Sequence, residues 1–462
     1  MSLEATLQQI DADLDHSVER LFDLIRIPSI STDPKYKDEC RKAGAWLVKE
    51  LKALGFDASL RETPGHPMVV AHHHKAGKDK PHALFYGHYD VQPADPLEKW
   101  QTPPFEPSRK KIKGDIDVLV GRGTADDKGQ LMTFVEAMRA YIKTTGGLPI
   151  NVTLLIEGEE ESGSPSLEGF LKENKKELSC GAAFVCDTDM WDRKTPAITT
   201  RLRGLMHEEM TIIGPRIDLH SGLFGGPAMN PIRVLSKILG NLHDKKGKVT
   251  IPDFYKGVSE LSAATKKQWK SLKLNEKKFL GHIGLSVPAG EKGRMVLEQV
   301  WSRPTAEVNG IFGGYIGEGT KTVLPSEATA KISFRLVGKQ DPAKIRKNFH
   351  KWVKAQLPKD CKVKFHGGSG NPGIVVPEDT PFVKASITAL KAEYKKAPVL
   401  KGSGGSIPIV GSFRNILGMD SVLVGFGLED DAIHSPNEKY DLASYHKGQR
   451  SWARILAELG QA

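Results

Sequence analysis

Two kinds of apolar pattern alternate through the first part of the chain. In some segments apolar residues recur at helical spacing with polar residues between them, and in others they form short uninterrupted runs. The first kind predicts helices, one closing on Gly55 and another on Gly146 and Gly147, and the second kind predicts buried strands. The helical segments are residues 4–26, 36–54 and about 128–143, and the apolar runs are residues 83–86, 150–156 and 181–186. Helices that alternate with buried strands indicate an α/β fold with a largely parallel sheet.

The pattern changes near Leu202 and returns after Pro377. Between these residues, "LMHEEMTIIG" and "EATAKISFRLVG" arrange apolar residues as strands do, and helical spacing appears between Pro231 and Leu280. The segments predicted after Pro377 are a helix over residues 380–395, a strand over 421–425 and a helix over 442–459. We therefore predict an α/β domain with a mixed sheet, interrupted by an inserted α+β domain. The first domain comprises residues 1–202 and 377–462, and the inserted domain residues 203–376.

Composition and charge limit the classes of partner. The 462-residue chain has a formal net charge of +10 and a sequence pI near 9.1, which alone would suit a nucleic acid or an anionic membrane. The lysines between Lys245 and Lys278, however, alternate with apolar residues as on the wet face of amphipathic helices. The N-terminal segment carries acids throughout and has no uninterrupted apolar stretch. We therefore expect neither a nucleic-acid nor a membrane partner.

The cysteine pattern suggests a compartment. Cys40, Cys180, Cys186 and Cys361 match neither the spacing of a zinc knuckle nor a dense disulfide framework. A reducing compartment, and hence the cytoplasm, is the expected location.

Five polar clusters follow predicted strands or precede a predicted helix. In open α/β sheets such loops at the carboxyl ends of strands carry the chemistry. Taken singly, each cluster could instead be a helix cap, a core histidine or a solvated acid. Taken together, two histidines and several carboxylates without a thiolate suit one or two ions of zinc, manganese or cobalt. The clusters are His88 with Asp90, "GRGTADDKG" (121–129), "IEGEEESGS" (156–164), "VCDTDMW" (185–191) and "DDAIHSPNEK" (430–439).

The consecutive histidines His72, His73 and His74 raise the question of a second metal site. They stand beside Lys75 and Lys78 in what the pattern predicts to be a loop, and no acidic residue is nearby in the sequence. We therefore expect no functional site at this triplet.

The chain resembles a known family through an ordered set of motifs. The set runs from near residue 20 to the C-terminus and is similar to the aminoacylase and carboxypeptidase-like dizinc peptidases, in particular their carnosinase and cytosolic non-specific dipeptidase branch. The motifs are G-H-x-D-V-Q-P, G-R-G-x-x-D-D-K-G, E-G-x-E-E-S-G-S, D-L-H-S-G-x-x-G-G, G-G-S-I-P and H-S-x-N-E-K.

The resemblance implies a centre with two divalent ions, zinc or manganese. His88 and Asp189 would hold one ion, Glu161 and His434 the other, and Asp126 would bridge them. Three neighbouring residues receive roles as well: Asp90 would fix the tautomer of His88, Glu160 would be the general base, and Glu159 would be a solvated acid. In the family the peptide bond that follows the residue matching Asp126 is typically cis.

The resemblance also implies roles for the inserted domain as a lid and dimerisation domain. His220 would reach the active site of a partner subunit and donate to the oxyanion, so a homodimer is expected. Arg335 and Ser406 would clamp the terminal carboxylate of a small peptide substrate, and Asn309 and Thr322 are weaker candidates for the same pocket.

Three functions are compatible with these residues. The first is a metal-dependent exopeptidase for dipeptides or short peptides with a free C-terminal carboxylate. The second is an amidohydrolase of the same family that acts on N-acyl amino acids or N-succinyl-diaminopimelate. The third is a binding protein that kept the fold and lost catalysis, which the intact ligand positions and Glu160 disfavour. We expect the first.

Overall fold

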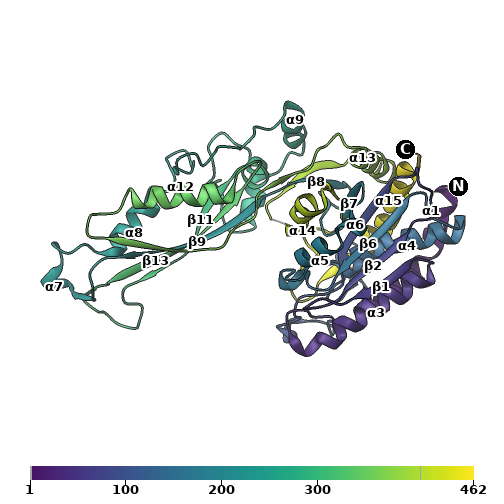
Figure 1. Ribbon diagram of the computed structural model, residues 1–462, viewed down its shortest axis with the longest axis horizontal. Helices are drawn as coiled ribbons and strands as arrows, with labels where there is room; N and C mark the ends of the chain where they lie inside the picture. Colours follow the sequence, from purple (N-terminus) through teal and green to yellow (C-terminus); the bar gives the residue numbers. More distant parts are fainter. Residues whose placement is uncertain (1–2, 406, 462) are drawn as a thin grey trace. The chain divides into compact units, whose positions relative to one another are not determined.

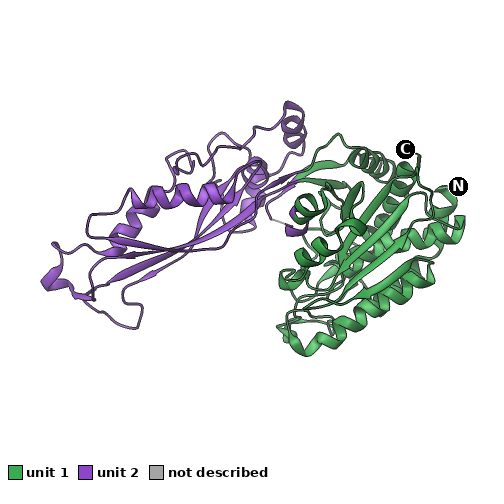
Figure 2. Ribbon diagram, in the orientation of Figure 1, with its two compact units in different colours: residues 1–200, 376–401, 412–462 green, residues 201–375, 402–411 purple. Residues whose placement is uncertain are grey.

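The computed structural model describes residues 3–405 and 407–461, which form two compact units (Figures 1 and 2). Unit 1 comprises residues 1–200, 376–401 and 412–462, and unit 2 comprises residues 201–375 and 402–411. Unit 2 is therefore inserted into unit 1 along the chain. The predicted α/β fold with a mixed sheet and an inserted second part is confirmed. Residues 402–411, which the sequence analysis gave to the first domain, group with unit 2.

A nine-stranded mixed sheet runs through unit 1. Its order is β1-β2-β6-β3-β7-β17-β8-β15, with β16 also paired to β8. The central strands β6, β3, β7 and β17 are parallel, whereas β2 joins β6, and β8 joins β17, in antiparallel fashion. The last strand, β15, pairs with the end of β8 that belongs to unit 2. The bounds are β1 (Asp57–Arg61), β2 (Met68–His73), β3 (His82–His88), β6 (Asn151–Glu157), β7 (Ala182–Val185), β8 (Ala197–Leu202), β15 (Ile374–Val375), β16 (Val399–Ser403) and β17 (Ser421–Leu423).

A separate three-stranded sheet in unit 1 has the order β18-β5-β4. Its strands are β4 (Ser108–Ile112), β5 (Ile116–Val120) and β18 (Lys439–Asp441). Lys439 pairs with Val120, so the segment before β18 lies beside the loop that follows β5. This pairing brings together two of the predicted polar clusters, which are far apart in the sequence.

Helices pack on the large sheet and bury a largely aromatic core. In Figure 1, α3 runs along β1 and β2, which it contacts, and α4 packs on β3 with α15 and α1 beside it. Trp452 of α15 meets Phe85 and Phe184 at ring-centroid distances of 5.5 Å each. The bounds are α1 (Leu3–Ala12), α2 (Leu14–Ile25), α3 (Lys37–Ala53), α4 (Lys128–Thr145), α5 (Leu167–Glu173), α6 (Lys175–Leu178), α13 (Pro381–Tyr394), α14 (Pro408–Ser412) and α15 (Leu442–Gln461), with short helices η1 (Pro34–Tyr36), η2 (Leu97–Lys99), η3 (Glu160–Ser162) and η4 (Phe413–Leu417).

The ends of two helices follow the predicted glycine signals. Gly55, which follows α3, has φ 82°, and Gly146, which follows α4, has φ 77°, both in the left-handed region that favours glycine. The single helix predicted over residues 4–26 is wrong, because it is divided at Asp13 into α1 and α2. The Asp13 carboxylate binds Arg20 at 2.6 Å, an interaction that the apolar pattern does not encode.

Unit 2 contains a four-stranded antiparallel sheet of order β11-β13-β9-β14. One face is buried against α8 and α12, with Met206, Ile332 and Phe334 of the sheet packed near Leu235 and Phe349 of the helices. A two-stranded ribbon, β10 with β12, stands apart from this sheet. The bounds are β9 (Gly204–Ile213), β10 (Leu219–His220), β11 (Thr305–Gly313), β12 (Val323–Leu324), β13 (Glu327–Leu336), β14 (Lys362–His366), α7 (Ser221–Phe224), α8 (Pro231–Gly240), α9 (Ala263–Ser271), α10 (Glu276–Gly281), α11 (Val296–Trp301) and α12 (Pro342–Lys354).

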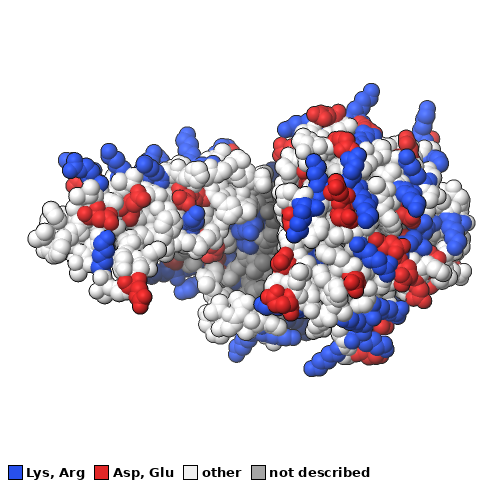
Figure 3. Space-filling view, turned by 90° about the horizontal axis from the view of Figure 1, so that it is seen from below, with Lys and Arg blue, Asp and Glu red and all other residues white. Residues whose placement is uncertain are grey.

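Charges of both signs are interspersed on the surface of unit 1. On the face drawn in Figure 3, Lys and Arg side chains alternate with Asp and Glu instead of forming one basic field. None of the four cysteines forms a disulfide. In the described part of the chain, every helix is too short or too polar to cross a membrane.

Candidate metal centre

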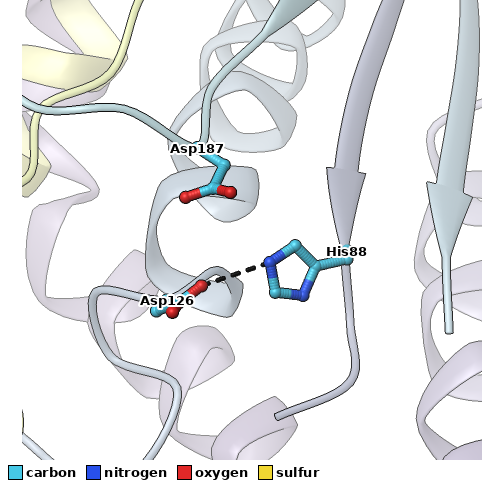
Figure 4. Close-up of side chains that lie close together, drawn as sticks. All are labelled: His88, Asp126 and Asp187. Atoms are coloured by element: carbon cyan, nitrogen blue, oxygen red, sulfur yellow. Dashed lines mark ion pairs between the residues drawn. The ribbon is translucent and has the colours of Figure 1, made fainter. Parts of the chain in front are cut away.

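The first half of the candidate centre lies where β3 and β7 end. His88 is the last residue of β3, and Asp187 follows β7 by two residues. Asp126 precedes α4, and its peptide bond to Asp127 is cis, as the family resemblance implies. Figure 4 shows the three side chains pointing toward one another, with His88 Nε2 3.2 Å from Asp126 Oδ1. Each of the three offers a ligand atom within 4.8 Å of the others.

The second half shares Asp126 with the first. Asp126 Oδ2 lies 2.9 Å from His434 Nε2, and Glu161 Oε2 lies 3.3 Å from the same nitrogen. Asp126, Glu161 and His434 therefore form a second group whose ligand atoms lie within 4.8 Å of one another. One carboxylate thus presents one oxygen to each of two histidines, which come from opposite ends of the sequence.

Two buried atoms of the candidate ligands, His88 Nε2 and Glu161 Oε1, have no hydrogen-bond partner among the described residues, although Nε2 lies within ion-pair distance of Asp126 Oδ1. Leaving such atoms unpaired in the interior costs about 1–3 kcal/mol each, so a ligand for them is expected. Imidazole nitrogens and carboxylate oxygens without a thiolate are the donor set of Zn²⁺ and Mn²⁺. The residues present therefore fit divalent metal ions.

The electrostatics of the centre also favour positive charge. Hydrogen bonds to Asp126 and then Glu161 raise the pKa of His434 to about 10. Burial opposes a charge on His88, but Asp126 and Asp90 outweigh it and raise the pKa of His88 above its usual value. Burial, followed by the charge of Asp126, raises the pKa of Asp187. The acids therefore attract positive charge to the position where a cation would stand.

The acid of the "VCDTDMW" cluster that lies close to His88 and Asp126 is Asp187, whereas Asp189 was the expected ligand. Asp189 belongs to neither group; its Oδ2 pairs with Lys401 Nζ at 2.5 Å, and its side chain is 50% exposed. The reason is the position of the strand end. Because β7 ends at Val185, Asp187 follows it at the sheet edge with its carboxylate near His88 and Asp126, and Asp189 lies two residues further along the loop. The strand boundary was the signal that could have distinguished the two aspartates.

Asp90 supports His88 and the Glu161 segment together. His88 Nδ1 bonds to the main-chain oxygen of Asp90 at 3.1 Å, while the Asp90 carboxylate lies 3.4 Å away. That carboxylate accepts hydrogen bonds from Ser31 Oγ at 2.6 Å and from the main-chain nitrogen of Glu161 at 3.0 Å. Asp90 thus fixes the Nδ1 side of the imidazole and leaves Nε2 directed at Asp126.

The three consecutive glutamates after β6 have different surroundings. Glu161 points into the centre, and the pKa of Glu160 is raised by burial and then by the charge of Glu161. The expectation that Glu159 is a solvated acid is wrong. Its side chain is 2% exposed and accepts hydrogen bonds from the main-chain nitrogens of His66 and Ser166. It ties two loops together at the edge of the centre.

Glu438 organises the loop that carries Asp126, and the sequence analysis gave it no role. One carboxylate oxygen accepts from the main-chain nitrogens of Ala125 and Asp126 at 2.9 and 3.1 Å. The other accepts from Gly123 N at 3.0 Å and from Arg122 Nη1 at 2.7 Å. Glu438 is fully buried and Arg122 is 1% exposed. The available signal was "H-S-x-N-E-K" itself, which places an acid directly before β18.

The chain matches a known protein family over most of its length. A model of the family described as peptidase family M20/M25/M40 matches residues 84–458. The chain belongs to this family. It is a hydrolase of the metallopeptidase class, and the resemblance to the carnosinase and dipeptidase branch is confirmed.

Relatives and solved structures from the M20 family match nearly the whole chain. The chain is 32% identical to Cys-Gly metallodipeptidase DUG1 of Candida albicans, over 96% of this chain and 95% of the relative. It is 29% identical to the Beta-Ala-His dipeptidase of Homo sapiens, over 99% and 93% respectively. The crystal structure of the M20 family metallo-carboxypeptidase Sso-CP2 from Sulfolobus solfataricus has a TM-score of 0.80 at 29% identity and covers 96% of this chain and 99% of that one.

The remaining M20 site candidates lie on unit 2. His220 ends β10, is exposed, and accepts a hydrogen bond at Nδ1 from Gly222 N at 3.0 Å. The main-chain oxygen of Thr322 accepts from Ser221 N at 3.0 Å, so Thr322 and His220 are close. Arg335 is half-buried on β13, and Asn309 is exposed on β11. Ser406 lies outside the described residues.

Replacing Glu438 by Ala in this M20 chain is expected to lower the free energy of unfolding by about 3–5 kcal/mol, because Arg122 is left buried without its charge partner. Urea denaturation of the metal-free protein measures the loss directly. Glu429→Ala, at an exposed position on the same segment, is the control and is expected to change the free energy of unfolding by less than about 0.5 kcal/mol. Equal denaturation midpoints for the two variants would contradict the role assigned to Glu438.

Proposed function

We propose that the chain is a dipeptidase-type exopeptidase with a centre for two divalent ions, zinc or manganese. It hydrolyses dipeptides or short peptides that have a free C-terminal carboxylate. The observation that carries the proposal is the position of Asp126, which presents Oδ1 to His88 and Oδ2 to His434. A carboxylate shared in this way between two groups of ligands suits a bridge between two cations.

The ligands follow from the two groups. His88 and Asp187 would hold one ion, Glu161 and His434 the other, and Asp126 would belong to both. Bound ions of this kind lower the pKa of a shared water and polarise the scissile carbonyl. The chain fixes the imidazole of His88 through Asp90, and it fixes the loop of Asp126 through Glu438.

Glu160 is the proposed general base. Its carboxylate accepts a proton from the attacking water and returns it to the leaving amine nitrogen. Burial and the neighbouring charge of Glu161 raise its pKa, which brings the group closer to the working pH of a proton carrier. Its place directly beside the ligand Glu161 supports this role.

The proposed substrate contacts come from unit 2. Arg335 and Ser406 would bind the C-terminal carboxylate, Asn309 and Thr322 are weaker candidates for the same pocket, and His220 of a second subunit would donate to the oxyanion. The family resemblance is the support for these roles. A guanidinium suits a carboxylate because it presents two parallel N–H donors.

A homodimer through unit 2 is part of the proposal. Strand β11 is an edge strand, since it pairs with β13 alone, and Ile311 and Phe312 on it are 55% and 49% exposed. Exposed apolar side chains on an edge strand favour pairing with another chain. Other large apolar side chains exposed on unit 2 near α7 and after β11 include Ile217, Leu223, Phe224, Met229, Tyr315 and Ile316.

The variant Phe312→Lys is expected to shift the protein from dimer to monomer and to lower kcat, because the monomer lacks the partner's oxyanion donor. Sedimentation velocity and the turnover of a dipeptide provide the two readouts. The control is Leu97→Lys on unit 1, where the side chain is 58% exposed, and it is expected to leave both unchanged. A wild-type protein that sediments as a fully active monomer would refute the dimer.

Substrate comparison tests the function itself. The relatives named above include a Cys-Gly metallodipeptidase and a Beta-Ala-His dipeptidase, which favours dipeptides over N-acyl amino acids. We expect turnover of Ala-Ala, Cys-Gly or β-Ala-His that is abolished by a chelator and restored by Zn²⁺ or Mn²⁺. Turnover of N-acetyl-methionine, with no turnover of any of the dipeptides, would establish the amidohydrolase alternative.

We also propose a cytoplasmic location, which the absence of a disulfide between any of the four cysteines supports.

A further inference from the structure

Two of the three consecutive histidines contact a buried hydroxyl group. The expectation that they lie in a loop without an acidic partner is wrong, because His72 and His73 end β2 and Glu177 lies 2.8 Å from His72 Nε2. Thr153 Oγ1 lies 3.0 Å from His72 Nδ1 and 3.2 Å from His74 Nε2. The hydroxyl therefore fills the space between the two rings, and these rings do not enclose an ion site.

A second buried hydroxyl group, that of Ser31, lies at the candidate metal centre. Ser31 is 8% exposed, and its Oγ donates to Asp90 Oδ2 at 2.6 Å. The segment that carries Ser31 runs beside the end of β3. Val91 N donates to the main-chain oxygen of Ser29 at 3.0 Å, and Ile30 forms a parallel bridge with Val91. This segment is therefore fixed along the main chain, and Ser31 extends the contact to the Asp90 carboxylate.

The Asp90 carboxylate contacts candidate ligands from both halves of the centre. Its Oδ1 lies 3.4 Å from Nδ1 of His88, and its Oδ2 accepts from the main-chain nitrogen of Glu161 at 3.0 Å. His88 belongs to one group of candidate ligands and Glu161 to the other. The Ser31 hydroxyl bonds to the same Oδ2 and comes from neither group. It is therefore a donor that can hold the plane of the carboxylate independently of the ligands.

Ser31 is itself anchored to the glutamate segment after β6. Its main-chain oxygen lies 3.1 Å from His66 Nε2, which donates to it because a carbonyl oxygen can only accept. The main-chain nitrogen of His66 donates in turn to Glu159 Oε1 at 2.8 Å. These contacts close a circuit, because Glu159 stands two residues before Glu161, the residue whose nitrogen donates to Asp90.

We propose that Ser31 is a positioning residue that couples the two halves of the metal centre through Asp90. The two ions are those of the proposed function, on which this inference rests. With the Ser31 hydroxyl in place, one carboxylate holds the imidazole of His88 and the main chain of Glu161 in a fixed relation. Without the hydroxyl, Oδ2 of Asp90 loses one of its two donors and the plane of the carboxylate is no longer set. Both groups of ligands then lose orientation together.

Ser31→Ala is expected to weaken the binding of both ions by about 10–100-fold each, the usual effect of removing a residue that orients a metal ligand. Asp187→Asn, in contrast, changes a candidate ligand of one ion and should weaken the binding of that ion alone. Competition of the full-length chain with a chromophoric chelator yields both affinities without a substrate. Ser31→Thr keeps the hydroxyl donor and is expected to bind both ions within about threefold of the wild type.

Ser29→Ala is the matched control. Ser29 is fully buried and its Oγ also donates at 2.6 Å, but the acceptor is the main-chain oxygen of Tyr89 and not a carboxylate. This variant should lose stability in urea and keep both metal affinities. Unchanged affinities in Ser31→Ala, a loss confined to one ion, or an equal loss in Ser29→Ala would each overturn the coupling alone. A wild-type chain that binds fewer than two ions would refute the two-ion centre and the coupling together, so the two failures are distinguishable.

Hydrogen exchange of the wild-type chain keeps the test decisive if Ser31→Ala does not fold. Residues 29–31 contain no candidate ligand, yet loading of both ions is expected to slow exchange of their amide hydrogens at least about tenfold, because the ions fix Asp90 from the side of the ligands. The amides of β1, residues 57–61, should exchange equally with and without metal. Equal rates at residues 29–31 with and without metal would contradict the coupling.

Discussion

Glu160→Gln is expected to lower kcat for a dipeptide by about 10²–10⁴-fold, the usual contribution of a positioned general base. The amide keeps the size of the side chain and cannot accept the proton of the attacking water. Because Glu160 belongs to neither group of candidate ligands, metal content should remain that of the wild type. Steady-state kinetics together with elemental analysis of the same preparation measure both quantities.

The matched control for this variant is Glu168→Gln on α5, where the side chain is 67% exposed and forms an ion pair with Lys172 on the same helix face. It is expected to change neither kcat nor metal content. If Glu160→Gln loses metal together with activity, Glu160 is a ligand. A kcat within a factor of about three of the wild type would remove it from proton transfer.

Asp187→Asn is expected to weaken binding of one of the two ions by more than about 10²-fold, since loss of a residue that only orients a ligand already costs about 10–100-fold. Activity at limiting metal should fall in parallel. Asp189→Asn should retain both ions, because Asp189 pairs with Lys401 and is half-exposed. Competition with a chromophoric chelator yields the two affinities.

The two aspartates control for each other, because they are of the same residue type and lie two positions apart. The opposite result, with metal lost in Asp189→Asn and kept in Asp187→Asn, would restore the assignment made from the sequence. Equal binding in all three proteins would show that the acid in this segment is not a ligand.

The sequence could predict where the chemistry lies because strand ends and polar clusters coincide. The runs predicted at 83–86, 150–156 and 181–186 are β3, β6 and β7, and the clusters after them converge. The sequence could not show which side chain of a polar cluster points into the candidate metal centre. Whether Asp187 or Asp189 turns inward depends on where β7 ends, and the burial of Glu159 depends partly on a hydrogen bond from His66, which is 93 residues away in the sequence.

Contacts between segments far apart in the sequence could likewise not be predicted from the local pattern of apolar and polar residues. Glu438 can accept hydrogen bonds from the Asp126 loop because β18 pairs with β5. The apolar pattern of either segment alone does not predict that pairing. The same holds for His72, Thr153 and His82, whose side chains meet although they come from β2, β6 and β3. Periodicity finds the strands, but the pairing of strands decides which side chains meet.

The order of the segments along the chain has a consequence for biosynthesis. His434, Glu438 and the central strand β17 are all encoded after unit 2, whereas His88, Asp126, Glu161 and Asp187 precede it. A nascent polypeptide therefore carries its early ligands through the translation of the whole insertion before their partners emerge from the ribosome. Capture of the two proposed ions by the finished centre would accordingly follow translation, and a message truncated before codon 434 would yield a protein without His434 and Glu438.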